Sequence, residues 1–206
     1  MEKAINIMEE PALNGDGLSA YRLGTIYRDG RVIDKDTDMA IAWLNVVPPT
    51  SAEGPAASYA LACTYFGLAT VLSANSPANL IKIRISKADA FWAMHSAAEA
   101  GHFLAQVDLA AYYRFGYGTE VDQMAPELWI RQAKSTLERH PSRVLQDFLA
   151  EGNTELHREA YGLMWKHYHE STDFDLRHFN VDPIDLVEGR SQCRPAGASN
   201  TDSSKP

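Results

Sequence analysis

Apolar and small residues recur along the chain with the spacing of an α-helix, in three segments that share one pattern. Each segment has a leucine, a small residue and a tyrosine at positions i, i+1 and i+4, which places these side chains along one stripe of a helix. In the first and third segments a glycine follows the tyrosine by three residues, an aspartate by nine and a tryptophan by sixteen. The members are Leu23, Gly24, Tyr27, Gly30, Asp36 and Trp43, and then Leu109, Ala110, Tyr113, Gly116, Asp122 and Trp129.

This order of residues predicts a helical hairpin, with a first helix, a turn and a second helix. The glycine suits the left-handed residue that ends a helix, and the aspartate can cap the N-terminus of the next one. The small residue allows the second helix to approach closely, and the tryptophan can then pack back on the first. Because one such hairpin cannot bury its own apolar faces, we expect several to stack into an all-α solenoid.

The pattern resembles that of the Sel1-like repeat family, which is related to the tetratricopeptide repeats. The family motif A-x-x-L-G-x-x-Y-x-x-G-x-G-V-x-x-D-x-x-K-A-x-x-W is matched at Ala20, Leu23, Gly24, Tyr27, Gly30, Ile33, Asp36, Ala40 and Trp43. The junction A-A-E-x-G-H is matched at 97–102, whereas Val32 replaces the second loop glycine and Pro126 stands where the first copy has Ala40. The resemblance covers about residues 15–135 and implies about three repeats that bind another protein.

The second segment, with Leu61, Ala62 and Tyr65, departs from the other two. Its Trp92 follows the tyrosine by 27 residues, eleven more than in the other segments. Leu68 replaces the glycine that should end the first helix, and Ile85 replaces the capping aspartate.

A turn is instead expected at Asn75-Ser76-Pro77, so both helices should be extended, over about 56–74 and 77–100. The alternation of Ile81, Ile83 and Ile85 with polar residues leaves a β-strand as the alternative. The enlarged hairpin is expected to contact a partner or a second copy, or else to cover the C-terminal helices.

The ends of the chain are expected to differ from the repeats. Residues 1–14 predict an N-terminal cap in which Ile5 and Met8 face inward, and residues 136–170 predict a degenerate capping hairpin. Residues 171–206 are expected to form a tail that could fold back along the surface and is disordered from about 189.

Composition narrows the classes of partner. The 206 residues carry a net charge of −8, which disfavours nucleic acid, and the two cysteines have no paired spacing for a disulfide or thiolate metal site. The chain shows no signal-peptide pattern and no run of about 20 apolar residues, so we expect a cytoplasmic protein with no membrane partner. The short repeat array favours a bacterial origin.

Candidate chemistry is sparse, and we predict no enzyme, cofactor, metal site or catalytic residue. The G-x-G-x-x-A match at 15–20 lacks a preceding strand and is interpreted as the turn before the first repeat. Cys63 is interpreted as a small core residue, and His157, His167, His169 and His178 as solvated or partly buried side chains. The period of the aromatic residues assigns the following to the core: Tyr27, Tyr65, Tyr113, Trp43, Trp92 and Trp129.

A partner is expected in the groove lined by the first helices of the hairpins. Their positions around these helices predict the following partner contacts: Tyr21, Arg22, Thr25, Arg28, Tyr59 and Asp108. The favoured function is a protein–protein interaction scaffold, adaptor or regulator, and the resemblance adds an immunity protein for a secreted toxin as one form of it. The alternative is a protein that binds or hydrolyses cell-wall fragments or β-lactams.

Overall fold

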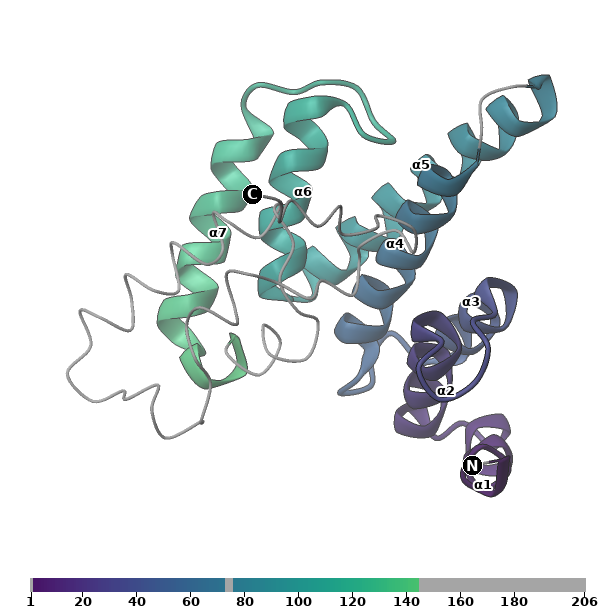
Figure 1. Cartoon of the computed structure of the whole chain (residues 1–206). Coiled ribbons are helices and arrows are strands. Elements are labelled where there is room, and N and C mark those ends of the chain that lie inside the picture. The colour runs from purple at the N-terminus through teal and green to yellow at the C-terminus, as the bar shows by residue number, and fades with distance from the viewer. Residues whose placement is uncertain (1, 73–75, 145–206) are drawn as a thin grey trace, which may run out of the picture.

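The computed structural model describes residues 2–72 and 76–144, and its regular secondary structure in this part is helical (Figure 1). The predicted all-α fold class is therefore confirmed for these residues. The helices are α1 (Glu2–Leu13), α2 (Gly17–Asp29), α3 (Thr37–Val46), α4 (Gly54–Val71), α5 (Pro77–Glu99), α6 (Phe103–Phe115) and α7 (Ala125–Arg139).

Consecutive helices pair as hairpins and then stack. The pairs α2–α3, α4–α5 and α6–α7 each pack together, α3 contacts α4, and α5 contacts α6. Buried side chains form one cluster around α1 to α4 and a second, larger one around α4 to α7. The repeated hairpins therefore share their apolar faces with their neighbours, as a solenoid requires.

The residues predicted to end one helix of a hairpin and to begin the next lie at these positions in the structure. Gly30 and Gly116 follow α2 and α6 in the left-handed conformation, each with φ of 66°. The Asp36 carboxylate accepts a hydrogen bond of 2.9 Å from the Met39 backbone N–H and caps α3. The Asp122 carboxylate accepts from the Met124 and Ala125 backbone N–H groups at the start of α7, which begins three residues after Asp122, at Ala125.

The small residue in the first repeat allows the close approach of two helices. A Cβ atom added to Gly24 would lie 2.6 Å from the Leu44 side chain of α3. Any larger residue would push α3 away from α2, which explains the glycine at this position.

The second hairpin is enlarged, as its irregular sequence predicts. Helix α4 has 18 residues and α5 has 23, and the far end of this pair stands clear of the neighbouring hairpins (Figure 1). The Ser76 hydroxyl caps α5 by accepting from the Asn79 N–H at 3.2 Å, with Pro77 in the first turn. The strand alternative for residues 81–85 is wrong, because these residues lie inside α5.

Helix α1 lies within residues 1–14, the range predicted as the N-terminal cap. Ile5 is buried and Met8 packs against the N-terminal cluster, so the inward face of α1 covers α2. Most of the predicted capping hairpin, the whole tail at 171–206 and four predicted histidines, His157, His167, His169 and His178, lie outside the described residues.

Candidate protein-binding surface

Of the six aromatic residues assigned to the core, five belong to it or pack against it and one does not. Trp43 is only 8% exposed. Four others are partly buried and pack against the two clusters: Tyr27, Tyr65, Tyr113 and Trp129. Trp92 is 65% exposed, so its assignment to the core is wrong.

The exposure of Trp92 results from a shift of one residue in the helical frame. Ala40, Trp43 and Leu44 of α3 are buried, as is Val47 just after it, and the same spacing in α5 is met by Ala90, Met94 and Ala97, which are buried, and Ala93, which is partly buried. Trp92 therefore precedes the position that corresponds to Trp43 by one residue. One residue rotates a side chain by about 100° around a helix, which turns Trp92 out of the core.

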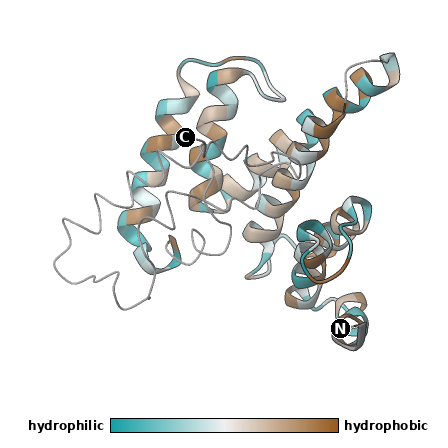
Figure 2. Ribbon diagram, in the orientation of Figure 1, coloured by the Kyte–Doolittle hydropathy of each residue, from teal (hydrophilic) through white to brown (hydrophobic). Residues whose placement is uncertain are grey.

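Trp92 belongs to an apolar stripe on the solvent side of α5. Ile81 is 53% exposed and Ile85 is 54% exposed, and with Ala88 and Trp92 they follow the spacing i, i+4, i+7 and i+11 of one helix face. We call these four residues the α5 outer face. Figure 2 shows apolar residues in the part of α5 that extends beyond the neighbouring hairpins, up to its last turn.

The opposite side of α5 packs against the protein. Ser86, Ala90, Met94 and Ala97 are buried there. Helix α5 is thus apolar on two faces, although only one of them is covered in the described part of the chain. A helix that is apolar all round is usually a buried helix, so the open face is a candidate for a binding partner.

An aromatic cluster holds the base of the α5 outer face. The Trp92 ring lies 5.2 Å from the ring of Phe91 and 6.0 Å from that of His95, measured between centroids. The His95 ring in turn lies 5.6 Å from Trp129 of α7. These contacts restrict the Trp92 side chain, which lowers the entropy that it would lose on binding.

The edges of the α5 outer face carry positive charge. Lys82 and Arg84 are both exposed beside the isoleucines, and Asp89 is half-buried on the same stretch of helix. This stretch therefore has a net charge of positive sign, whereas the whole chain has a net charge of −8. The surface is therefore suited to a partner that combines apolar and acidic side chains.

The residues predicted to line the groove do not form one surface. Arg22 is exposed, and Tyr21 and Thr25 are half-buried, so all three are accessible on α2. Arg28, Tyr59 and Asp108 are buried, and they cannot touch a partner without rearrangement of the core. The assignment of these last three as contacts is corrected, whereas that of the first three stays a prediction.

Tyr59 and Asp108 join α4 to α6 inside the protein. The Tyr59 hydroxyl donates a hydrogen bond of 2.9 Å to the Asp108 carboxylate. The Tyr59 ring also stacks on His102, with centroids 4.5 Å apart, and the His102 Nδ1 atom caps α6. This buried polar cluster fixes the junction between the second and third hairpins. Its residues come from the inter-repeat motif and helix interiors, and helical phase alone did not separate them from groove positions.

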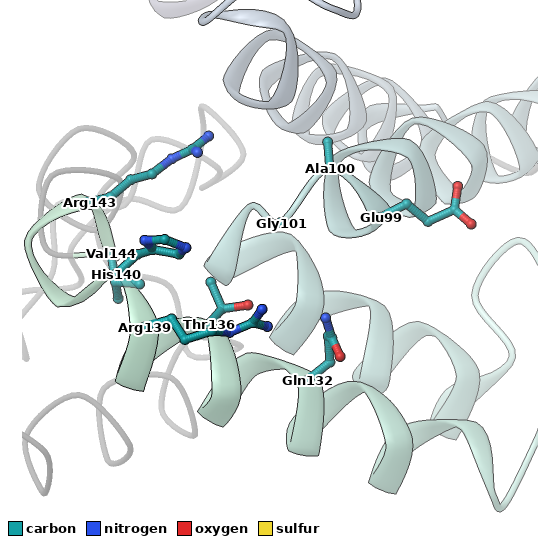
Figure 3. Close-up of a pocket in the computed structure, with 9 residues that line it drawn as sticks. All are labelled: Glu99, Ala100, Gly101, Gln132, Thr136, Arg139, His140, Arg143 and Val144. Atoms are coloured by element: carbon teal, nitrogen blue, oxygen red, sulfur yellow. The ribbon is translucent and has the colours of Figure 1, made fainter.

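A pocket of about 220 Å³ lies between the C-terminal ends of α5 and α7 (Figure 3). Arg139, His140 and Arg143 line one side of it, and Glu99 lies across from them. Because the pocket borders residue 145, where the described part of the chain ends, we do not assign it as the site.

Two interpretations from the sequence concern residues 15–20 and Cys63. The 15–20 match to a dinucleotide motif is a turn in which the Asp16 carboxylate caps α2, and hydrogen bonds from Ser19 lower the pKa of Asp16. Cys63 is buried beside Ala62 in the larger cluster. Within residues 2–72 and 76–144 no group of three or more potential ligands could hold a metal ion. No helix in the same part is both long and apolar enough to cross a bilayer.

The chain is similar to known proteins at the level of solved structures. No protein-family model matches the chain, and no curated protein matches it. The chain is similar to the crystal structure of a Sel1 repeat protein from Oxalobacter formigenes, with 26% sequence identity and a TM-score of 0.47. The similarity covers 71% of this chain and 99% of that one.

Proposed function

We propose that this protein is a protein–protein interaction scaffold that binds its partner through the α5 outer face. The observation that carries the proposal is the exposure of Ile81, Ile85 and Trp92 on one face of a helix. Isolated exposed apolar residues are common, but an aligned group next to fixed aromatic rings is typical of a binding surface. The length of α5 supports the proposal, since it presents this face beyond the neighbouring hairpins.

The accessible residues of α2 extend the proposal. Arg22, Tyr21 and Thr25 are proposed as further contacts for a partner that also reaches the first hairpin. A cytoplasmic location is proposed with the scaffold role. The role of immunity protein, and the alternative of a cell-wall or β-lactam protein, remain predictions from the resemblance.

The test is a pair of double variants in the full chain, expressed with an affinity tag in the native cell. Ile81→Asp with Ile85→Asp places two charges on the α5 outer face. Ile7→Asp with Leu13→Asp makes the same change at two exposed apolar residues of α1 and serves as the matched control. Partners should be lost from the first variant and retained by the second, with both variants showing the helix content of the wild type by circular dichroism.

The partner identified in this way is then purified and its Kd is measured against both variants. We expect at least a tenfold rise in Kd for the α5 variant, since two buried apolar contacts are replaced by charges. Equal Kd values for the α5 variant and the wild type would overturn the proposal.

A further inference from the structure

The partner chemistry that suits the α5 outer face also occurs in the sequence of this chain. The face is apolar, with Lys82 and Arg84 exposed at its edges. Residues 171–188 have the complementary composition, with five carboxylates, one arginine and a set of large apolar residues. The apolar members are Phe174, Leu176, Phe179, Val181, Ile184, Leu186 and Val187.

We propose that residues 171–188 bind the α5 outer face of their own molecule and compete there with the external partner. The proposal rests on the proposed function of this face as a protein-binding surface. Apolar side chains of the segment would cover Ile81, Ile85 and Trp92, and its carboxylates would lie near Lys82 and Arg84. The segment would thus regulate the scaffold by occupying its site.

The length of chain between the two parts permits the contact. Residues 145–170 separate Val144 from the segment, and a chain of this length can span up to roughly 85 Å at about 3.3 Å per residue. Helix α5 is about 35 Å long, at 1.5 Å per residue. The connection therefore does not limit which part of α5 the segment reaches.

Charge distinguishes this occupant from a second copy of the same face. An isologous dimer through the α5 outer face would place two copies each of Lys82 and Arg84, but only two of Asp89, in one interface, which leaves an excess of positive charge. Like charges at an interface are unfavourable, whereas the acidic segment neutralises them. The arrangement within one molecule also gains a high effective concentration.

The test is photo-crosslinking of the purified full chain. Ile85→p-benzoylphenylalanine places the probe in the α5 outer face, and Ile7→p-benzoylphenylalanine in α1 is the control. After irradiation, mass spectrometry should find crosslinks within one molecule from position 85 to residues 171–188, with a yield that does not depend on protein concentration. Position 7 should give no crosslink to that segment.

Two further variants test the chemistry of the contact. Phe174→Ser with Phe179→Ser should remove most of the crosslink by deleting apolar contacts, and Arg84→Glu should reduce it by charge repulsion. Crosslinks from position 85 between two molecules, crosslinks to other parts of the chain, or no crosslink at all would each overturn the proposal.

Partner binding separates this inference from the proposed function. If the segment occupies the face nine-tenths of the time, Phe174→Ser with Phe179→Ser should lower the apparent Kd of the external partner about tenfold. An unchanged Kd would overturn the competition and leave the scaffold role standing. Loss of sensitivity to Ile81→Asp with Ile85→Asp would instead overturn the scaffold role, whatever the crosslinking shows.

Discussion

The hairpins α2–α3 and α4–α5 derive from the same sequence pattern but have different lengths and different surfaces. The first has helices of 13 and 10 residues, with Gly30 ending one and Asp36 beginning the other. The second lacks both residues, and its helices continue to a turn at Ser76. The residues that end and begin helices, and not the apolar stripe, therefore set the length of each hairpin.

The extra length has a consequence for burial. The stripe of buried positions along α3 includes Trp43, whereas the corresponding stripe along α5 runs one residue away from Trp92. The far half of α5 also extends beyond the hairpins that could cover its second face. The same residue types thus give a closed unit in the first hairpin and an open face in the second.

The largest expected difference between the two hairpins concerns their tryptophans, Trp43 and Trp92. Trp43→Ala should lower the free energy of unfolding by about 3–5 kcal/mol, since it deletes a large buried side chain. Trp92→Ala should lower it by no more than about 1 kcal/mol, since most of the ring is already in water. Urea denaturation followed by circular dichroism measures both changes. Equal losses would show that Trp92 is a core residue after all.

The motif leucines provide a second comparison with a smaller expected difference. Leu23 is fully buried, but Leu61, its counterpart in the enlarged hairpin, is only partly buried. Leu23→Ala should cost about 2–5 kcal/mol, and Leu61→Ala clearly less, because less apolar area leaves the core. The motif alone would give the two substitutions the same cost, and denaturation midpoints at equal m-values decide between these expectations.

The sequence predicted the hairpins because their signals are local. The conformation of Gly30, the cap at Asp36 and the turn at Ser76 each depend on a few neighbouring residues. The absence of a stop at Leu68 was enough to predict that α4 continues. Such signals act through backbone conformation and hydrogen bonding within one turn, and they can be identified without the rest of the fold.

The site was not predictable in the same way, because burial depends on contacts between distant parts of the chain. Trp92 matched the motif by residue type, yet the packing of α5 against its neighbours selected a frame that excludes it. Tyr59 and Asp108 were placed on an open groove, but 49 positions apart in sequence they meet in the core. The sequence does carry one signal for the opposite face, because Ala90, Met94 and Ala97 follow the helical spacing of a small and apolar stripe that leaves out Trp92.

Two glycine substitutions, one in each hairpin, should change the free energy of unfolding in opposite directions. Gly30→Ala should destabilise the protein by about 1–2 kcal/mol, because φ is 66° there and an alanine is strained in the left-handed region. Gly67→Ala should stabilise it by about 0.5–1 kcal/mol, because Gly67 lies inside α4 and an added Cβ meets no atom within 4 Å. Thermal denaturation of both variants gives the signs directly. A stabilising Gly30→Ala would contradict the role of this residue as the helix stop.

The smallest expected effect concerns Tyr117, which contacts both helices of the enlarged hairpin. Its ring lies 4.9 Å from that of Phe66, and the Lys87 Nζ atom lies 5.2 Å from its centroid. Burial raises the pKa of Tyr117 from 10.0 to about 12. Between pH 10 and 12 the unfolded chain therefore loses this proton while the folded chain keeps it, so the free energy of unfolding falls as the pH rises.

Tyr117→Phe should reduce that alkaline fall and leave stability at pH 7 nearly unchanged, because the buried hydroxyl has no hydrogen-bond partner among the described residues. Tyr65 and Tyr113, whose pKa values burial also raises, should maintain a weaker pH dependence in this variant. Urea denaturation at several pH values between 8 and 11.5 measures how steeply the free energy of unfolding falls with pH in the wild type and in Tyr117→Phe. If Tyr117→Phe has the same slope as the wild type, the Tyr117 hydroxyl is solvated, and the loop before α7 does not close against the enlarged hairpin.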